Sequence, residues 1–341
     1  MKSDQMKSIT IFNNKGGVGK TTFLCNIASY MALRMGKRVL VIDADPQCNA
    51  TSYLISESAL SSLYESVSHE TIDSFLDPIR HGKGYRANPI NVQQSSRFGV
   101  DLIPGDPRLA LSEDFLAQDW VQGRSGDARG LQTTFVFQDI MLRYSNYDYI
   151  FIDVGPSLGA INRAVLIGSD YFVVPMSSDI FSLMAIRNIS LSLIEWKRLL
   201  GKGLEEYKIK EQSDYLIGQN PAVWRLSFAG YLIQQYTAKT SEGQRRPVAA
   251  YERILRRVPG VIDKELVKRF STLNATVEYK LGEIPNLHSI VPMSQTANAP
   301  IFDLKARDGV VGAHFAKVDE AGEIYKEIAK HLLANLEATP R

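Results

Sequence analysis

A glycine-rich stretch near the start of the chain carries the residue types that bind phosphate groups. In IFNNKGGVGKTT, Gly19, Lys20 and Thr21 form the closing half of the pattern G-x-x-x-x-G-K-[ST]. Glycines let backbone N–H groups surround phosphate oxygens, the lysine is expected to reach the β- and γ-phosphates, and the threonine hydroxyl to coordinate Mg²⁺. The opening glycine of the pattern is replaced by Asn14, and Lys15 adds a second lysine. This stretch predicts a nucleotide site.

Three aspartates close apolar segments that are typical of buried strands. Asp43 and Asp45 end KRVLVIDAD, and Asp153 ends YDYIFID. Because the carboxyl ends of parallel strands line the ligand crevice of an open sheet, we expect these acids near the phosphates. We predict that Asp43 and Asp153 hold waters of Mg²⁺, and that Asp45 orients the attacking water. The alternative is that they are ordinary turn residues. With the phosphate loop, they indicate an Mg²⁺-dependent nucleotide hydrolase.

The order of the elements around these residues predicts a doubly wound α/β fold. A strand over 8–14 leads through the loop into a helix that Gly36 ends, and a second strand covers 37–45. Further strands are predicted over 98–106, 147–156, 170–179, 227–236 and 287–294. This order gives right-handed crossovers, a mainly parallel sheet and helices on both faces.

The whole chain has the composition of a folded soluble protein. It has 341 residues, 45% hydrophobic and 22% charged, and a net charge of +2, so a basic surface for nucleic acid must be local. Cys25 and Cys48 form no C-x-x-C pair, which argues against a disulfide framework or a cysteine metal site. No secretory signal and no run of 18 apolar residues is present, so we expect a cytoplasmic protein. No linker divides residues 1–341, and we expect a single domain with insertions near 58–98 and 191–290.

Several segments are similar to those of the ParA/MinD family of ATPases. KGGVGKTT resembles the deviant Walker A motif of that family, and VLVIDADPQCNAT resembles its switch I strand. YDYIFIDVGPSLGAINRAVLIGSDYFVVPMSSDIFSLMAI resembles its switch II strand, helix and following strand. The resemblance is strong over 7–52 and 147–190, and fair at 227–237 and 288–332. It departs at Gly155, where relatives commonly have the first of two prolines.

The resemblance implies a P-loop ATPase that binds ATP and Mg²⁺ and forms a homodimer in its ATP state. Lys15 matches the signature lysine, which in this family reaches across the dimer interface to the partner's ATP. Two sandwiched nucleotides concentrate negative charge that such a cation neutralises. The expected catalytic residues are therefore Lys15, Lys20 and Asp45, and the expected metal-binding residues are Thr21, Asp43 and Asp153. The expected nucleotide contacts are Gly16, Gly17, Val18, Gly19, Lys20, Thr21 and Thr22, with Gln234 and the backbone near Pro292 at the base.

A basic segment late in the chain is the candidate for binding DNA. ParA-like proteins typically bind DNA non-specifically as ATP dimers, and such binding needs Lys and Arg against phosphates. A helix is predicted over 245–260, with Pro247 in its first turn and Gly260 past its end. The candidate residues are Arg245, Arg246, Arg253, Arg256 and Arg257. The alternative is a solvated helix face with local ion pairs.

These features predict a DNA partition or positioning ATPase, nucleoid-associated when bound to DNA, whose hydrolysis a ParB-like partner protein stimulates. Two alternatives stay open. One is an ATPase switch that uses 191–290 to bind a protein partner, in positioning another cargo or in defence, without DNA. The other is an ATP-dependent amide-forming enzyme of the same superfamily. The closing helix EIYKEIAKHLLANLEATPR mixes Glu with Lys and has no basic apolar tail, so no membrane binding is expected.

Overall fold

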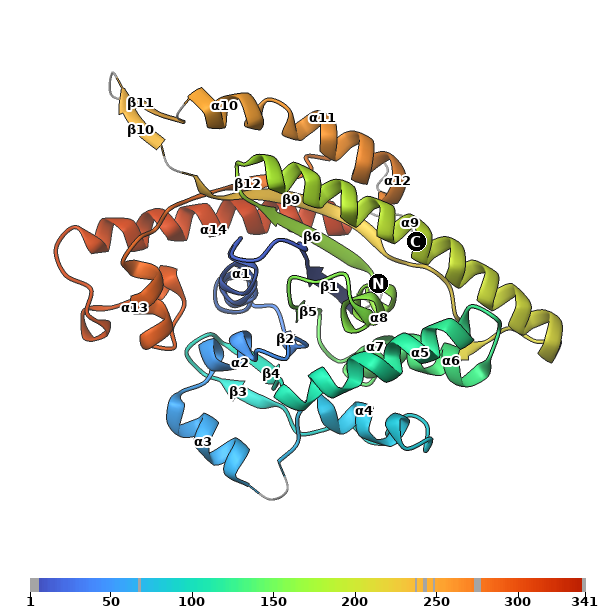
Figure 1. The fold of residues 1–341 in the computed structure, drawn as a ribbon. Helices are drawn as coiled ribbons and strands as arrows, with labels where there is room; N and C mark the ends of the chain where they lie inside the picture. Colours follow the sequence, from blue (N-terminus) through green and yellow to red (C-terminus); the bar gives the residue numbers. More distant parts are fainter. Residues whose placement is uncertain are drawn as a thin grey trace.

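The structure is a computed structural model that describes residues 6–66, 69–236, 238–241, 244–247, 249–272 and 277–338. Within these residues, an eight-stranded sheet runs in the order β12-β9-β6-β1-β5-β2-β4-β3, with helices on both faces (Figure 1). The paired neighbours are parallel except the edge pair β3 and β4, which is antiparallel. The predicted doubly wound, mainly parallel α/β fold is confirmed.

The strands of the sheet are three to ten residues long. They are β1 (Lys7–Ile11), β2 (Val39–Asp43), β3 (Gln93–Ser95), β4 (Val100–Ile103), β5 (Tyr149–Asp153), β6 (Tyr171–Met176), β9 (Ser227–Tyr236) and β12 (Lys280–Pro285). Two small hairpins pair β7 (Leu216–Ile217) with β8 (Asn220–Pro221), and β10 (Ala238–Ser241) with β11 (Gln244–Pro247). Every residue of β2, β5 and β6 is buried, because helices cover both faces of a parallel sheet.

Two hydrophobic cores lie on opposite faces of the sheet. Along β2, Leu40 and Ile42 belong to one core and Val39 and Val41 to the other, as the two-residue period of a strand requires. The second core contains α1 (Lys20–Met35), α2 (Asn49–Leu54), α3 (Glu57–Glu65), α13 (Ile290–Thr296) and α14 (His314–Glu337). The first contains α4 (Asp73–Arg80), α5 (Glu113–Gly123), α6 (Ala128–Thr134), α7 (Val136–Leu142), α8 (Ala160–Gly168), α9 (Ile180–Glu211), α11 (Val258–Ile262) and α12 (Lys268–Phe270).

The strand predicted over 287–294 is wrong. The edge strand of the sheet is β12, which precedes that segment, and 290–296 forms the short helix α13. Pro292 stands in the first turn of this helix, where backbone N–H groups have no partner within the helix and proline is tolerated. The apolar run therefore packs as a helix face, with Ile290 buried.

The single helix predicted over 245–260 is also wrong. Arg245 and Arg246 lie on strand β11, and the helix α10 (Ala249–Leu255) starts only after it. Arg253 is in α10, whereas Arg256 and Arg257 form the turn that leads into α11. Pro259 at the start of α11 has no N–H to continue the hydrogen bonds of α10, so a new helix begins there. Gly260 lies inside α11 instead of ending a helix. Because strand β11, helix α10 and the following turn each hold some of the five predicted arginines, these residues do not share one helix.

Candidate nucleotide-binding site

Two predicted acids stand side by side at the carboxyl edge of the sheet. Asp43 ends β2 and Asp153 ends β5, and the parallel register pairs these two residues directly. Both carboxylates are completely buried. The loop of Asp45 leaves β2 at the same edge, and the phosphate loop leaves β1, whose Ile11 is the register partner of Asp153 on its other side. The sheet therefore brings the predicted loop and acids together.

The phosphate loop uses glycine where the backbone requires it. Gly17 and Gly19 have φ values of 71° and 73°, in the left-handed region that glycine adopts without strain. Gly19 is the residue before α1, and a Cβ there would lie 2.2 Å from Gln234 Oε1. Asn13 fixes the start of the loop, because its side chain accepts a hydrogen bond from Lys15 N at 2.9 Å and donates to Pro175 O at 2.8 Å.

Asp153 offers an oxygen suited to a cation. Its Oδ2 accepts a hydrogen bond from Thr21 Oγ1 at 2.7 Å, while Oδ1 is buried and has no hydrogen-bond partner among the described residues. Burial, and next the charge of Asp43, raises the pKa of Asp153. A hydroxyl beside an unsatisfied carboxylate oxygen matches the oxygen ligands that Mg²⁺ prefers. The residues present fit the predicted cation.

Asp43 holds the segment that follows β2. Its Oδ2 accepts hydrogen bonds from Thr51 N at 2.8 Å and Thr51 Oγ1 at 2.6 Å, and its Oδ1 accepts one from Asp45 N at 3.2 Å. Burial raises the pKa of Asp43 to about 6, and the bonds from Thr51 oppose that rise. Thr51 Oγ1 in turn accepts a hydrogen bond from Gly105 N at 2.8 Å. Asp43 therefore holds residues 44–51, the switch I loop, and also stands beside Asp153 in the sheet.

Lys20 is buried beside these acids. Burial lowers the pKa of its ammonium, and the charges of Asp153 and Asp45 act in the opposite direction. Its Nζ lies 3.4 Å from the carbonyl oxygen of Lys15, a long contact for a hydrogen bond. A cation held this loosely is placed to exchange that contact for a phosphate oxygen.

A cavity of about 490 Å³ opens above the phosphate loop. It is lined by Gly17, Val18, Gly19, Lys20, Thr21, Thr22, Asp45, Gln47, Asn49, Ser52, Tyr53, Pro156 and Gln295. Four other predicted residues, Lys15, Gly16, Asp43 and Asp153, do not line this cavity. Of these, Asp43 and Asp153 lie in the protein interior. The cavity thus combines the phosphate loop with Asp45 and with Pro156, which lies in the loop after β5.

Comparison with known proteins places these motifs in a family. Residues 6–204, more than half of the chain, match the AAA_31 family, described as an AAA domain. The chain belongs to this family and is a ParA/MinD-like P-loop ATPase. It is 28% identical over 236 residues to the chromosome-partitioning ATPase Soj of Thermus thermophilus, covering 69% of this chain and 72% of that protein. It is 33% identical over 184 residues to the sporulation initiation inhibitor protein Soj of Bacillus subtilis, covering 54% of this chain and 63% of that protein.

Solved structures show the same ParA/MinD-like fold. The protein DIP2308 of Corynebacterium diphtheriae is 31% identical, with a TM-score of 0.70 over 86% of this chain and 97% of that chain. The ATP complex of a McdA variant from Cyanothece is 17% identical, with a TM-score of 0.60 over 98% of each chain. At this identity the second comparison speaks for the fold alone.

A second cavity of about 230 Å³ brings together the two residues predicted at the base. It is lined by both Gln234 and Pro292, and it shares Gly19 and Thr22 with the first cavity. Gln234 Nε2 donates a hydrogen bond to Gly19 O at 3.3 Å, so its carboxamide rests against the phosphate loop. The second cavity therefore adjoins the first at the phosphate loop.

The switch II loop, residues 154–159, lies close to Asp45. A Cβ at Gly155 would lie 3.2 Å from Asp45 Oδ1, so a side chain there would crowd that carboxylate. Asn162 of α8 donates hydrogen bonds to Gly155 O at 2.7 Å and Ser157 O at 2.8 Å, which hold the loop to its helix. Sequence reasoning missed Asn162, although it stands in the segment that resembles switch II.

Lys15 pairs with an acid outside the phosphate loop. Its Nζ donates a hydrogen bond to Asp179 Oδ2, and the two side chains form an ion pair. Asp179 also caps α9, because its Oδ1 accepts a hydrogen bond from Ser182 N at 3.0 Å. Sequence reasoning missed this acid as well, although an aspartate immediately before a helical pattern is a capping signal.

Other predicted features are outside this site. None of Arg253, Arg256 and Arg257 lines either cavity. Among the described residues, no group of three or more His, Cys, Asp or Glu side chains is arranged to hold a metal ion, so Mg²⁺ would depend on phosphate and water for most of its ligands. The described helices also include none that is long and apolar enough to cross a membrane.

Proposed function

We propose that this ParA/MinD-like protein is a molecular switch that binds and hydrolyses ATP with Mg²⁺ and dimerises in its ATP state. The observation that carries the proposal is the difference in position between two lysines. Lys20 is buried at the cavity, where it can contact phosphates of its own nucleotide. The Lys15 side chain pairs with Asp179 at the start of α9 and is partly exposed, so it can contact a second subunit.

The residues of the site have distinct roles in this proposal. The N–H groups of Gly17 to Thr22 and the Lys20 ammonium bind the phosphates. Mg²⁺ would be held by the Thr21 hydroxyl and, through waters, by Asp43 and Asp153, and it supplies neutralisation of the phosphate charge. Asp45 lines the cavity and orients the attacking water. Gln234 and the backbone at Pro292 contact the base.

The surface next to Lys15 supports a dimer. Directly after Asp179, the side chains of Ile180, Phe181 and Met184 on the first turns of α9 are exposed by 42%, 66% and 53%. Exposed apolar side chains grouped around a polar site are typical of a surface that another molecule covers. A second copy, brought face to face by two ATP molecules, would bury these side chains and accept Lys15 from its partner.

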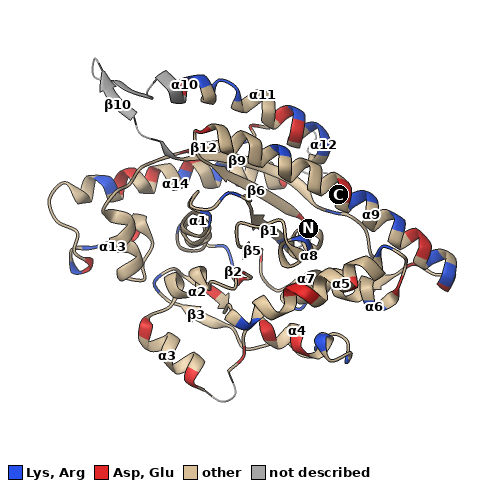
Figure 2. Cartoon of the chain, viewed as in Figure 1, with Lys and Arg blue, Asp and Glu red and all other residues tan. Residues whose placement is uncertain are grey.

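DNA is the proposed partner of the ATP dimer. Arg253, Arg256 and Arg257 are exposed, and Lys and Arg recur along the outer run from α10 to α12, interspersed with acids (Figure 2). The acids reduce the positive charge of this surface, since Arg256 lies 3.7 Å from Glu252 in an ion pair. The similarity to a chromosome-partitioning ATPase supports DNA as the partner. Arg245 and Arg246 stay part of this proposal, although their side chains lie outside the part of the chain that the structure describes. We also propose that a ParB-like protein stimulates hydrolysis.

The remaining sequence predictions also stay proposals. We propose that the chain acts as one ATPase domain in which 58–98 and 191–290 are insertions, the second carrying the surface specific for a partner. The protein would be cytoplasmic and, in its ATP state, associated with the nucleoid.

The test is binding of non-specific duplex DNA with ATP, with ADP and without nucleotide, across a salt series, using the wild type and Lys15→Ala. We expect binding with ATP alone, a steep loss of affinity with salt and failure of the variant. A protein that dimerises with ATP but binds no DNA in any state would overturn the DNA role and favour a protein partner of 191–290. ATP turnover that requires a carboxylate substrate and forms an amide would instead favour the metabolic alternative.

A further inference from the structure

The first turn of α8 controls the shape of the switch II loop. Asn162, in this turn, is buried and donates to the carbonyl oxygens of Gly155 and Ser157. Pro156, between them, lines the nucleotide cavity, and Gly155 lies against Asp45. Any movement of the first turn of α8 would therefore change the wall of the cavity beside Asp45.

A carboxylate from another helix caps this first turn. The residue before α8 is Gly159, which has no side chain to serve as a cap. Glu113, the first residue of α5, replaces it: its Oε1 accepts a hydrogen bond from Ala160 N, and its Oε2 accepts one from Ile161 N at 3.1 Å. A negative charge at a helix N-terminus is also favoured by the helix dipole. Both oxygens are thus aimed at N–H groups that have no partner within α8.

The backbone at this contact is shaped for the carboxylate. A Cβ at Gly159 would lie 2.3 Å from Glu113 Oε1, so only glycine lets the carboxylate come this close. A second contact joins the same two helices, because the Arg163 guanidinium of α8 lies 4.8 Å from the ring centre of Trp120 on α5. The start of α8 is therefore in contact with both the first residue and a later turn of α5.

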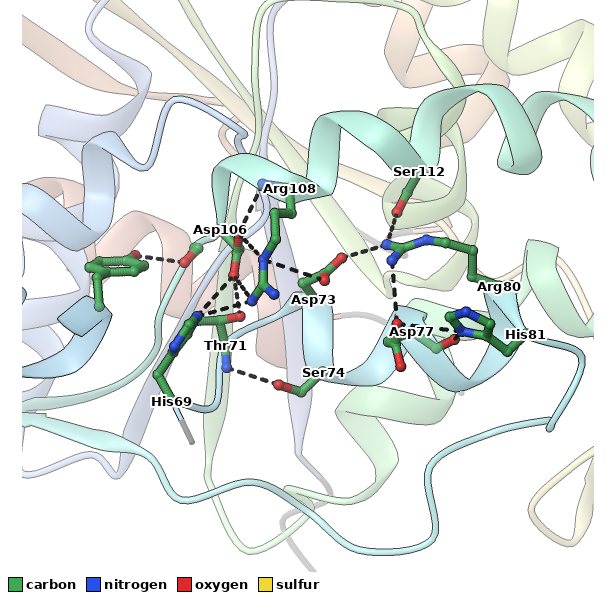
Figure 3. A network of polar contacts seen from close by, with 12 residues as sticks. His69, Thr71, Asp73, Ser74, Asp77, Arg80, His81, Asp106, Arg108 and Ser112 are labelled. Carbon is green, nitrogen blue, oxygen red and sulfur yellow. Dashed lines mark hydrogen bonds and ion pairs between the residues drawn. The ribbon is translucent and has the colours of Figure 1, made fainter. Parts of the chain in front are cut away.

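A network of ion pairs fixes the segment that carries Glu113. The 3-10 helix η1 (Pro107–Ser112) leads directly into α5. Arg80 of α4 donates hydrogen bonds to Ser112 Oγ at 3.0 Å and to Asp73 Oδ1 at 2.6 Å, and Arg108 lies 3.8 Å from Asp73 (Figure 3). Asp106, which caps η1, follows Gly105, whose N–H is bound by Thr51. The segment before Glu113 thus connects the switch I loop to α4.

We propose that Glu113 is a positioning residue for ATP hydrolysis, a role that rests on the proposed ATPase function. By capping α8, it keeps Asn162 in place, and Asn162 keeps Gly155 and Pro156 in place beside Asp45. Glu113 does not line either cavity, so ATP binding by the phosphate loop does not depend on it. Loss of the carboxylate would therefore lower kcat while leaving KM for ATP almost unchanged.

The test compares Glu113→Ala and Glu113→Gln with Asp114→Ala, a control at the exposed neighbouring position of α5. For Glu113→Ala we expect kcat to fall about tenfold, because the loop beside Asp45 loses its support, with KM within about twofold of the wild type. Glu113→Gln keeps one acceptor oxygen and should recover part of kcat. Asp114→Ala should match the wild type.

Hydrogen exchange provides a readout independent of turnover. In Glu113→Ala, the amides of 160–163 should exchange about tenfold faster, while the phosphate-loop amides and the thermal unfolding temperature change little. If Glu113→Ala does not fold, Glu113→Gln decides by the same two measurements. Unchanged kcat and unchanged hydrogen exchange in a folded variant would overturn the role of Glu113 but not the proposed ATPase function. Absence of hydrolysis by the wild type would overturn the proposed ATPase function itself, and with it this role.

Discussion

The Lys15 ammonium is bound within its own subunit by Asp179, a residue 164 positions later in the chain. Side-chain exposures of 28% and 30% place the pair at the surface, beside the apolar start of α9. A lysine proposed to reach the ATP of a partner subunit must leave this carboxylate first. In the proposed dimer, the pair would therefore oppose association by the free energy of one partly exposed ion pair in each subunit.

Replacing Asp179 by asparagine should strengthen the ATP dimer. Asparagine retains an oxygen to cap α9 but removes the charge that holds Lys15. Because exposed ion pairs contribute about 0.2–1 kcal/mol, we expect the dimer dissociation constant to fall by a factor of about 1.4 to 5 per subunit released. Sedimentation in ATP, in an Asp45→Asn background that limits turnover, measures it. A weaker dimer would show instead that Asp179 contributes to the interface.

Substitutions at two residues of the cavity should have different effects on ATP binding and on ATP hydrolysis. Lys20→Ala removes the buried cation at the phosphates, so we expect ATP binding to fall below detection in calorimetry. Asp45→Asn keeps an acceptor for Gln47 N, whose hydrogen bond to Asp45 Oδ1 is 3.0 Å, but loses the charge that orients water. We expect its kcat to fall about 100-fold or more with ATP affinity retained. Near-normal turnover in Asp45→Asn would contradict its assigned role.

Two glycines of α9 should respond to alanine in opposite directions. A Cβ at Gly203 would lie 2.2 Å from Gly123 O, where α9 crosses α5, whereas a Cβ at Gly201 would have no atom within 4 Å. We expect Gly203→Ala to lower the free energy of unfolding by about 1–3 kcal/mol through overpacking. Gly201→Ala should raise it by about 0.4–1 kcal/mol, since alanine favours the helix. Chemical denaturation measures both, and similar effects in the two variants would contradict the helix crossing.

Neutralising the exposed arginines should weaken DNA binding in a salt-dependent way. In the combined variant Arg253→Ala, Arg256→Ala and Arg257→Ala, each lost phosphate contact should reduce the slope of log affinity against log salt by about 0.9. ATP turnover without DNA should stay at the wild-type rate, because these residues line neither cavity. The matched control is Arg198→Ala, an exposed arginine of α9 paired with Glu195 at 2.8 Å. An equal loss in both variants would show that no specific basic surface exists.

Much of the nucleotide site could be predicted because its signals are local. The phosphate loop joins a strand to a helix within a few residues, and Asp43 and Asp153 each end an apolar run with the composition of a buried strand. Parallel pairing then places the two acids at one edge whatever the rest of the chain does. For the same reason the doubly wound fold followed from the order of elements.

Tertiary structure alone decided which distant groups meet. Nothing near Glu113 in the sequence indicates that its carboxylate caps α8, 47 positions later, and nothing near Lys15 points to Asp179. The apolar run around Pro292 has the composition of a strand, but β12 occupies the sheet edge and leaves that run to pack as a helix. Local patterns determine what a segment can form, whereas long-range packing determines which partner satisfies its charges and its backbone.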